Sequence, residues 1–123
     1  MKILVVEDHP ADLKLMGAVL RMSGHIVGEQ TSAEGVVEAV MADKPDIILL
    51  DLRLPGMDGL TLTRQLKANA DTRLIPIVAV TAYPNHYLRA EILAAGCEAC
   101  VLKPIDTREL AHRLEQVVTM KQQ

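Results

Sequence analysis

The sequence has very few aromatic residues, with two tyrosines and no phenylalanine or tryptophan among its 123 residues. The hydrophobic core must therefore be aliphatic, and the aromatic platforms on which single-stranded nucleic acids stack are missing. A formal net charge of −3 also disfavours general binding to polyanions. We therefore expect no direct contact with nucleic acid.

Long hydrophobic runs are absent as well. Glu7 and Asp8 interrupt the first apolar run before the hydrophobic region of a signal peptide would be complete. The apolar run at 47–50 is far shorter than the roughly 20 residues of a membrane-spanning helix. We expect a cytoplasmic protein without membrane contact, and the length favours one domain over residues 1–123.

The two cysteines, Cys97 and Cys100, have the C-x-x-C spacing that occurs in redox pairs and in metal sites. A structural zinc site requires four ligands, but there is no second C-x-x-C and the four histidines lack ligand spacing. Packed free thiols are therefore favoured, and a redox or metal role stays open as the alternative.

Short runs rich in Ile, Leu and Val alternate with amphipathic segments along the chain. They predict five strands, at 2–6, 26–29, 46–50, 77–80 and 99–102. The first, third and fourth are almost continuously apolar, as in parallel strands that are buried on both faces.

Five helices are expected between and after these strands. The first ends at Gly24, the second starts with Thr31 or Ser32 as its N-cap and closes before Pro45, and the third covers roughly 60–68. The fourth covers 84–95, and the fifth follows Thr107 as its N-cap. This alternation predicts an α/β protein with an open, doubly wound, five-stranded parallel sheet that has helices on both faces.

Polar residues follow four of the predicted strands: Glu7 and Asp8 the first, Asp51 the third, Thr81 the fourth and Lys103 the fifth. The carboxyl ends of parallel strands meet at one edge of such a sheet, where the functional crevice lies. Three carboxylates there would repel one another without a cation, and oxygen ligands with room for water favour Mg²⁺. A carboxylate can also attack phosphorus when nearby positive charge and hydroxyl groups neutralise the phosphoryl oxygens.

The residues around these positions resemble the response-regulator receiver family. The similar segments are VVEDHP at the first strand end, DIILLDLRLPGMDG around Asp51, VTA at Thr81 and LKP at Lys103. The resemblance covers essentially the whole chain. It implies a flavodoxin-like fold with strand order 2-1-3-4-5, like that of single-domain chemotaxis and cell-division regulators.

The resemblance also implies how a phosphoryl group would be held. Asp51 would be the phosphoacceptor, Lys103 would pair with the phosphoryl group, and the Thr81 hydroxyl and the Ala82 backbone N–H would hydrogen-bond it. The peptide bond between Lys103 and Pro104 would be cis, as X-Pro bonds can be.

A Mg²⁺ site is implied beside the acceptor. Asp8 and Asp51 would be direct ligands, Glu7 would bind through water, and the backbone carbonyl of Arg53 would complete the protein's share of the ligands.

The implied function is signalling rather than turnover of a substrate. A sensor histidine kinase or histidine phosphotransfer protein would phosphorylate Asp51, and self-catalysed transfer and autodephosphorylation would be the only chemistry. A downstream protein would bind the face formed by the fourth helix, fifth strand and fifth helix. Cys100 occupies the position of an aromatic residue that changes rotamer in many family members, so that switch cannot operate here in its usual form, and Tyr83 is the candidate substitute.

Other interpretations remain. The chain could be the receiver part of a longer regulator or hybrid kinase, or a binding module that is not phosphorylated. A phosphatase of the haloacid-dehalogenase type is disfavoured, because Arg53 stands where the acidic residue that protonates the leaving group is required. The glycine-rich motifs of nucleotide-binding proteins are missing.

Overall fold

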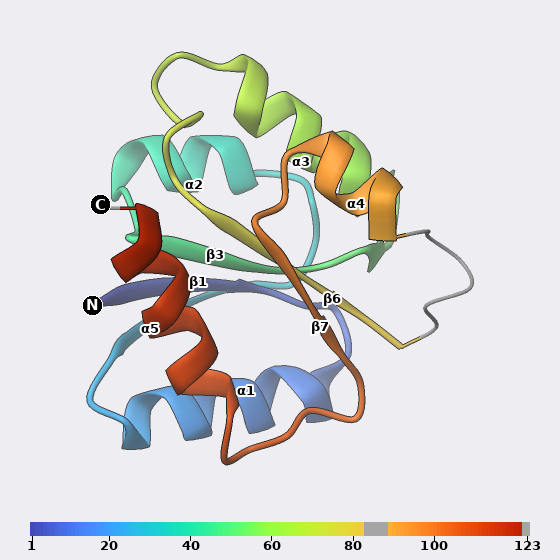
Figure 1. Cartoon of the computed structure of the whole chain (residues 1–123). Coiled ribbons are helices and arrows are strands. Elements are labelled where there is room, and N and C mark those ends of the chain that lie inside the picture. The colour runs from blue at the N-terminus through green and yellow to red at the C-terminus, as the bar shows by residue number, and fades with distance from the viewer. Residues whose placement is uncertain (83–88, 122–123) are drawn as a thin grey trace.

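A computed structural model describes residues 1–82 and 89–121 of the chain. Its main sheet consists of parallel strands β1 (Lys2–Val6), β2 (Ile26–Gln30), β3 (Ile47–Asp51), β6 (Ile77–Thr81) and β7 (Ala99–Leu102). Their spatial order is β2-β1-β3-β6-β7 (Figure 1). Because β6 and β7 are the fourth and fifth strands of this sheet along the chain, the predicted order 2-1-3-4-5 is confirmed.

The helices cover both faces of the sheet, as a doubly wound α/β fold requires (Figure 1). Helices α1 (Pro10–Met22) and α5 (Leu110–Lys121) lie on one face, and α2 (Val36–Ala42), α3 (Gly59–Ala68) and α4 (Arg89–Ala95) lie on the other. None of the helices among the described residues has the length and apolar composition needed to cross a membrane.

The core consists of two aliphatic layers, one on each side of the sheet. Leu4 and Val6 of β1 belong to the layer under α2, α3 and α4, whereas Ile3 and Val5 belong to the layer under α1 and α5. All residues of β3 and β6 are buried. The nearly continuous apolar runs in the sequence therefore reflect strands that are covered on both faces.

Helix α2 begins later than expected. Its N-cap is Gly35, which has a φ of +81°, so the prediction of Thr31 or Ser32 as the cap is wrong. Glycine adopts a left-handed conformation without a steric penalty, and the chain turns into the helix there rather than at a side-chain cap.

Helix α5 also begins later than expected, at Leu110, so the prediction of Thr107 as its N-cap is wrong. Asp106, not Thr107, accepts a hydrogen bond through Oδ1 from the backbone N–H of Arg108, at 2.9 Å. The Asp106 carbonyl also accepts a bond from the N–H of Leu110, at 3.1 Å. The Asp106 carboxylate thus stabilises the turn that leads into the helix, as aspartate side chains commonly do.

A short hairpin, which the sequence did not predict, links β3 to α3. It consists of β4 (Arg53–Leu54) and β5 (Met57–Asp58), with Gly56 at a φ of +79° between them. Asp58 then caps α3 by accepting a hydrogen bond from the N–H of Leu60, at 3.0 Å. The end of β3 is therefore tied closely to the start of α3. The expected start of the fourth helix, at Pro84, lies outside the described residues.

Gly59 packs directly against the end of β3, and we predict that Gly59→Ala is strongly destabilising. A Cβ atom at this position would lie 2.5 Å from Leu52 Cα and 2.9 Å from the Asp51 carbonyl oxygen. Because both are backbone atoms, relief of the clash requires β3 or α3 to shift, which costs about 1–3 kcal/mol. The free energy of unfolding in urea measures this loss.

Gly28→Ala is the matched control, because the nearest atom to its added Cβ is the Leu4 side chain at 3.4 Å. We expect it to change stability by less than about 1 kcal/mol. Equal stabilities of the two variants would contradict the close packing of α3 on β3.

Candidate functional site

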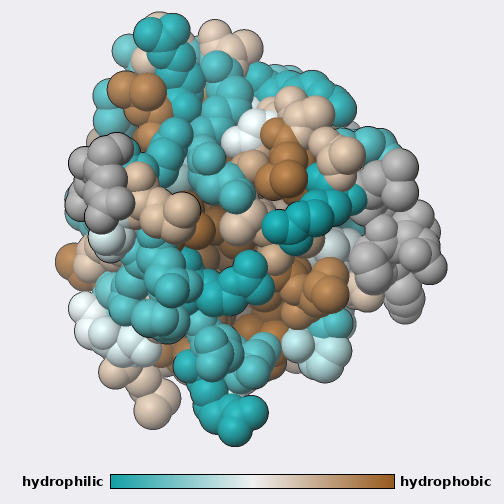
Figure 2. Space-filling model, in the orientation of Figure 1, coloured by the Kyte–Doolittle hydropathy of each residue, from teal (hydrophilic) through white to brown (hydrophobic). Residues whose placement is uncertain are grey.

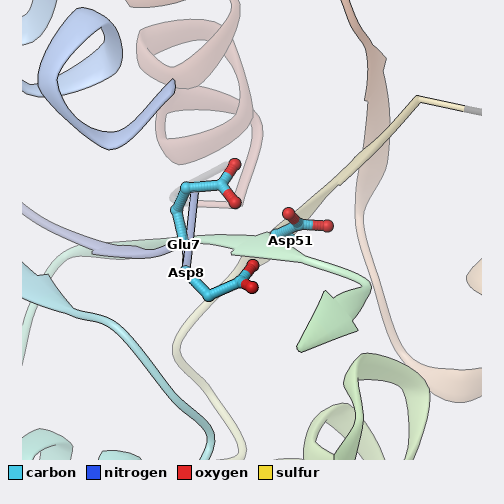
Figure 3. A group of neighbouring side chains, drawn as sticks. All are labelled: Glu7, Asp8 and Asp51. Carbon is cyan, nitrogen blue, oxygen red and sulfur yellow. The ribbon is translucent and has the colours of Figure 1, made fainter. Parts of the chain in front are cut away.

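Three carboxylates meet at the carboxyl ends of β1 and β3, which are neighbours in the sheet (Figure 3). One oxygen each from Glu7, Asp8 and Asp51 lies within 4.8 Å of the others. Glu7 and Asp51 are buried and Asp8 is exposed. The structure therefore brings together the acidic residues that the sequence placed at this edge.

Lys103 follows β7 and reaches into the same cluster. Its Nζ lies 2.8 Å from Glu7 Oε1, 3.0 Å from Asp12 Oδ2 and 3.1 Å from Asp51 Oδ2. One ammonium group is thus shared by Glu7, which follows β1, Asp12 of α1 and Asp51 of β3. The backbone N–H of Lys103 donates to the Thr81 carbonyl at 2.9 Å, and the Lys103-Pro104 peptide bond is cis, as expected.

Burial and the neighbouring charges both shift the pKa values of the cluster. Burial, as the largest cause, and the neighbouring Asp51 carboxylate together raise the pKa of Glu7 to about 7, against the opposing effect of Lys103. Burial alone would lower the pKa of Lys103, but the contacts with Glu7, Asp12 and Asp51 outweigh it and raise that pKa. One ammonium therefore does not satisfy the whole cluster, and further positive charge would stabilise it.

The cluster fits a hard divalent cation such as Mg²⁺. Glu7 Oε1 is buried and accepts no hydrogen bond from the described residues, since the nearby Lys103 Nζ is in ion-pair contact without hydrogen-bond geometry. Carboxylate oxygens are the ligands that Mg²⁺ prefers, and it usually keeps several waters. The cluster opens onto a cleft of about 720 Å³, which leaves room for such waters.

The other predicted residues surround Asp51. The Arg53 backbone N–H donates to Asp51 Oδ1 at 2.9 Å, and both Arg53 and Ala82 line the cleft. Thr81 ends β6 and is buried, one residue beyond the Val80 that pairs with Asp51 across the sheet. Each of the predicted residues is therefore at, or next to, the cleft. Tyr83 lies outside the described residues.

Sequence reasoning missed Asp12. Its Oδ2 atom contacts Lys103 and also lies 3.2 Å from Nδ1 of His9. A signal was available, because Asp12 is four residues after Asp8 and falls in the first turn of α1. That turn begins at the end of β1, so a residue there can face the same cleft.

The two cysteines lie elsewhere, in and against the core layer under α2, α3 and α4. Both are free, and the Cys97 thiol lies 3.7 Å from the Thr63 hydroxyl. Burial raises the pKa of Cys97 to about 11 and also raises the pKa of Cys100. Both thiols are thus held in their unreactive protonated form, as the packed-thiol interpretation expects.

Comparison with known proteins agrees with this geometry. Residues 3–115 match the family model of the response regulator receiver domain. The chain belongs to the response regulator receiver family.

The receiver is 39% identical over 122 residues to the response regulator PleD of Caulobacter vibrioides, and this match covers 98% of the chain but 26% of PleD. It is 34% identical over 103 residues to the polar-differentiation response regulator DivK of Brucella ovis, with 84% of each protein covered. The chain therefore spans about a quarter of one relative and most of the other.

A solved structure is also similar to this receiver. It is the receiver domain of a sensor histidine kinase from Pseudomonas aeruginosa PAO1, with 33% identity, a TM-score of 0.88 and coverage of 96% of this chain and 97% of that one. That structure has a magnesium ion coordinated in its active-site cleft. The carboxylate cluster of this receiver is consistent with the same kind of site.

The raised thiol pKa values generate a prediction for the receiver. In a Cys100→Ser variant, Cys97 should react with iodoacetamide at pH 8 at least about tenfold more slowly in the folded protein than in urea. Because burial raises its pKa to about 11, the rate in the folded protein should still increase between pH 8 and pH 10. Equal rates in folded and unfolded protein, or rapid disulfide formation in the wild type under mild oxidation, would favour the redox alternative instead.

Proposed function

We propose that this receiver domain accepts a phosphoryl group on Asp51 from a phosphohistidine of a sensor histidine kinase or histidine phosphotransfer protein. The observation that carries the proposal is the position of the Asp51 carboxylate. It lines the open cleft, and each of its oxygens has a partner: Oδ1 accepts from the Arg53 backbone N–H, and Oδ2 accepts from Lys103 Nζ. The carboxylate is thus held in one orientation toward an incoming phosphorus atom.

In the transfer, an Asp51 oxygen forms a bond to phosphorus while the bond between phosphorus and the donor's imidazole nitrogen breaks. The imidazole leaves and takes up a proton. Lys103 moves from Asp51 to the phosphoryl oxygens, and the Thr81 hydroxyl and the Ala82 N–H donate hydrogen bonds to them. We propose no turnover beyond this self-catalysed transfer and autodephosphorylation.

Mg²⁺ is the cofactor that we propose for this site. Asp8 and Asp51 would bind it directly, Glu7 through water, and the Arg53 backbone carbonyl would be a further ligand. Mg²⁺ would supply the positive charge that offsets the charge on the phosphoryl oxygens. The buried Glu7 Oε1 without a hydrogen bond from the described residues supports this assignment.

The proposed output surface is formed by α4, β7 and α5. Leu93 on α4 and Leu102 on β7 are exposed there, and a groove of about 330 Å³ runs between β7 and α5. Figure 2, in which β7 and α5 face the viewer, shows hydrophobic patches among hydrophilic side chains. Leu102 and Pro104 line this groove and flank Lys103, so a movement of Lys103 toward a phosphoryl group would alter the surface that a partner protein contacts.

Signalling through this surface would not use the usual aromatic rotamer change, because the position three residues before Lys103 is Cys100. The Cys100 carbonyl accepts a hydrogen bond from Arg113 Nη2 of α5 at 3.2 Å. We infer that the backbone of β7 carries the change to α5. This proposal concerns the receiver itself, whose relatives include proteins of similar and of much greater length.

The test of phosphoryl transfer uses acetyl phosphate as the donor and intact-protein mass as the readout. With Mg²⁺ present, the wild type should gain the mass of one phosphoryl group, and it should gain none when the metal is chelated. Asp51→Asn should gain none under either condition, because an amide oxygen does not replace the carboxylate as a nucleophile.

Asp58→Asn is the matched control in the same cleft. Asparagine is as good a helix cap as aspartate, so α3 keeps its start and the variant should be labelled like the wild type. An unlabelled wild type, or equal labelling of Asp51→Asn, would refute the proposal and favour a receiver that acts only by binding.

A further inference from the structure

Asp12 has a place at the site that neither the family match nor the resemblance assigns. It lies in the first turn of α1, and its Oδ2 is 3.0 Å from Lys103 Nζ. Its side chain is 30% exposed, against 15% for Lys103, so the pair is partly shielded from water. An ion pair of this kind is screened less than one on the open surface.

The contact differs in kind from the other two that Lys103 makes. Glu7 and Asp51 belong to the carboxylate cluster that fits a metal ion, whereas Asp12 is not part of that cluster among the described residues. Asp12 therefore offers Lys103 a partner of its own on the α1 side of the cleft. Its second neighbour, His9, is 65% exposed and holds the same oxygen at 3.2 Å.

Phosphorylation would change the balance around this ammonium. A phosphoryl group on Asp51 adds negative charge and three acceptor oxygens to a cleft that Asp12 also lines. Lys103 then has to leave Asp12 for the phosphoryl oxygens or be shared between them. The Asp12 carboxylate also repels the incoming group, although its partial exposure weakens that repulsion.

We propose that Asp12 is a positioning residue that holds Lys103 on the α1 side of the cleft and restrains phosphorylation of Asp51. The inference rests on the proposed phosphoryl transfer. Asp12 competes with the phosphoryl group for the ammonium, so its charge lowers the rate of transfer.

Asp12→Asn tests this, because asparagine keeps the size of the side chain and loses only its charge. With acetyl phosphate as the donor, we expect phosphorylation to be about three- to tenfold faster than in the wild type, as expected for removing a partly screened charge near the reacting atoms. The change should appear in the maximal rate more than in the donor concentration at half-maximal rate, because Lys103 acts on the phosphoryl group during transfer. Asp12→Glu keeps the charge and should restore a rate near that of the wild type.

Asp43→Asn is the control for net charge. Asp43 is exposed and pairs with Lys2 at the opposite end of β1 from the site, so its removal should leave the rate unchanged. A second readout is independent of phosphorylation: in protein labelled with ¹³C-lysine, the Lys103 Cε resonance should shift in Asp12→Asn and remain near its wild-type position in Asp12→Glu.

The outcomes separate this inference from the proposed function. An Asp12→Asn rate equal to or below that of the wild type, or an unmoved Lys103 resonance, would overturn the role of Asp12. A wild type that takes no phosphoryl group would instead refute the proposed function and the rate effect with it, and the resonance would then decide whether Asp12 holds Lys103.

Discussion

The structure of the site depends on one ammonium group, that of Lys103, which is shared by three carboxylates: one follows β1, one lies in the first turn of α1 and one ends β3. Strands β1 and β3 end and α1 begins at the same edge of the sheet, and Lys103 directly follows the end of β7 at that edge. Removing one partner of a buried ion pair typically costs about 3–5 kcal/mol, because the other charge is left without compensation. The contacts of Lys103 with Glu7 and Asp51 depend on the sheet order β2-β1-β3-β6-β7, because this order makes β1 and β3 neighbours.

Much of this could be predicted from the sequence, because the decisive signals are local. Continuous apolar runs marked the buried strands, and the polar residue after each run marked the edge where Glu7, Asp51 and Lys103 meet. The start of α5 could not be decided in this way, since Asp106 and Thr107 are adjacent and both residue types commonly precede helices. The hairpin β4–β5 is too short to leave a periodic pattern, with two residues in each strand. The spacing of Asp12 from Asp8 indicated that Asp12 could face the cleft, but its contact with Lys103 depends on how α1 packs near the end of β7.

The same geometry connects the site to the surface. One oxygen of the Asp51 carboxylate accepts a hydrogen bond from the Arg53 backbone, and the other accepts one from Lys103. Loss of the first bond would affect the segment after β3, and loss of the second would affect the segment after β7. Lys103 lies directly between Leu102, which is 51% exposed, and Pro104, which lines the groove beside α5. With cysteine at position 100, the path that we propose from Asp51 to the surface runs along β7. The proposed path would work by a population shift between two arrangements of β7 and α5.

The most direct measurement of the central claim is the chemical identity of the phosphorylated atom. Borohydride reduces an aspartyl phosphate to homoserine, so treatment of the phosphorylated protein followed by peptide mass spectrometry locates the acceptor. The account predicts homoserine at position 51 and aspartate at positions 8 and 12. Homoserine at another position, or a phosphoryl group that survives reduction on His9, would contradict it.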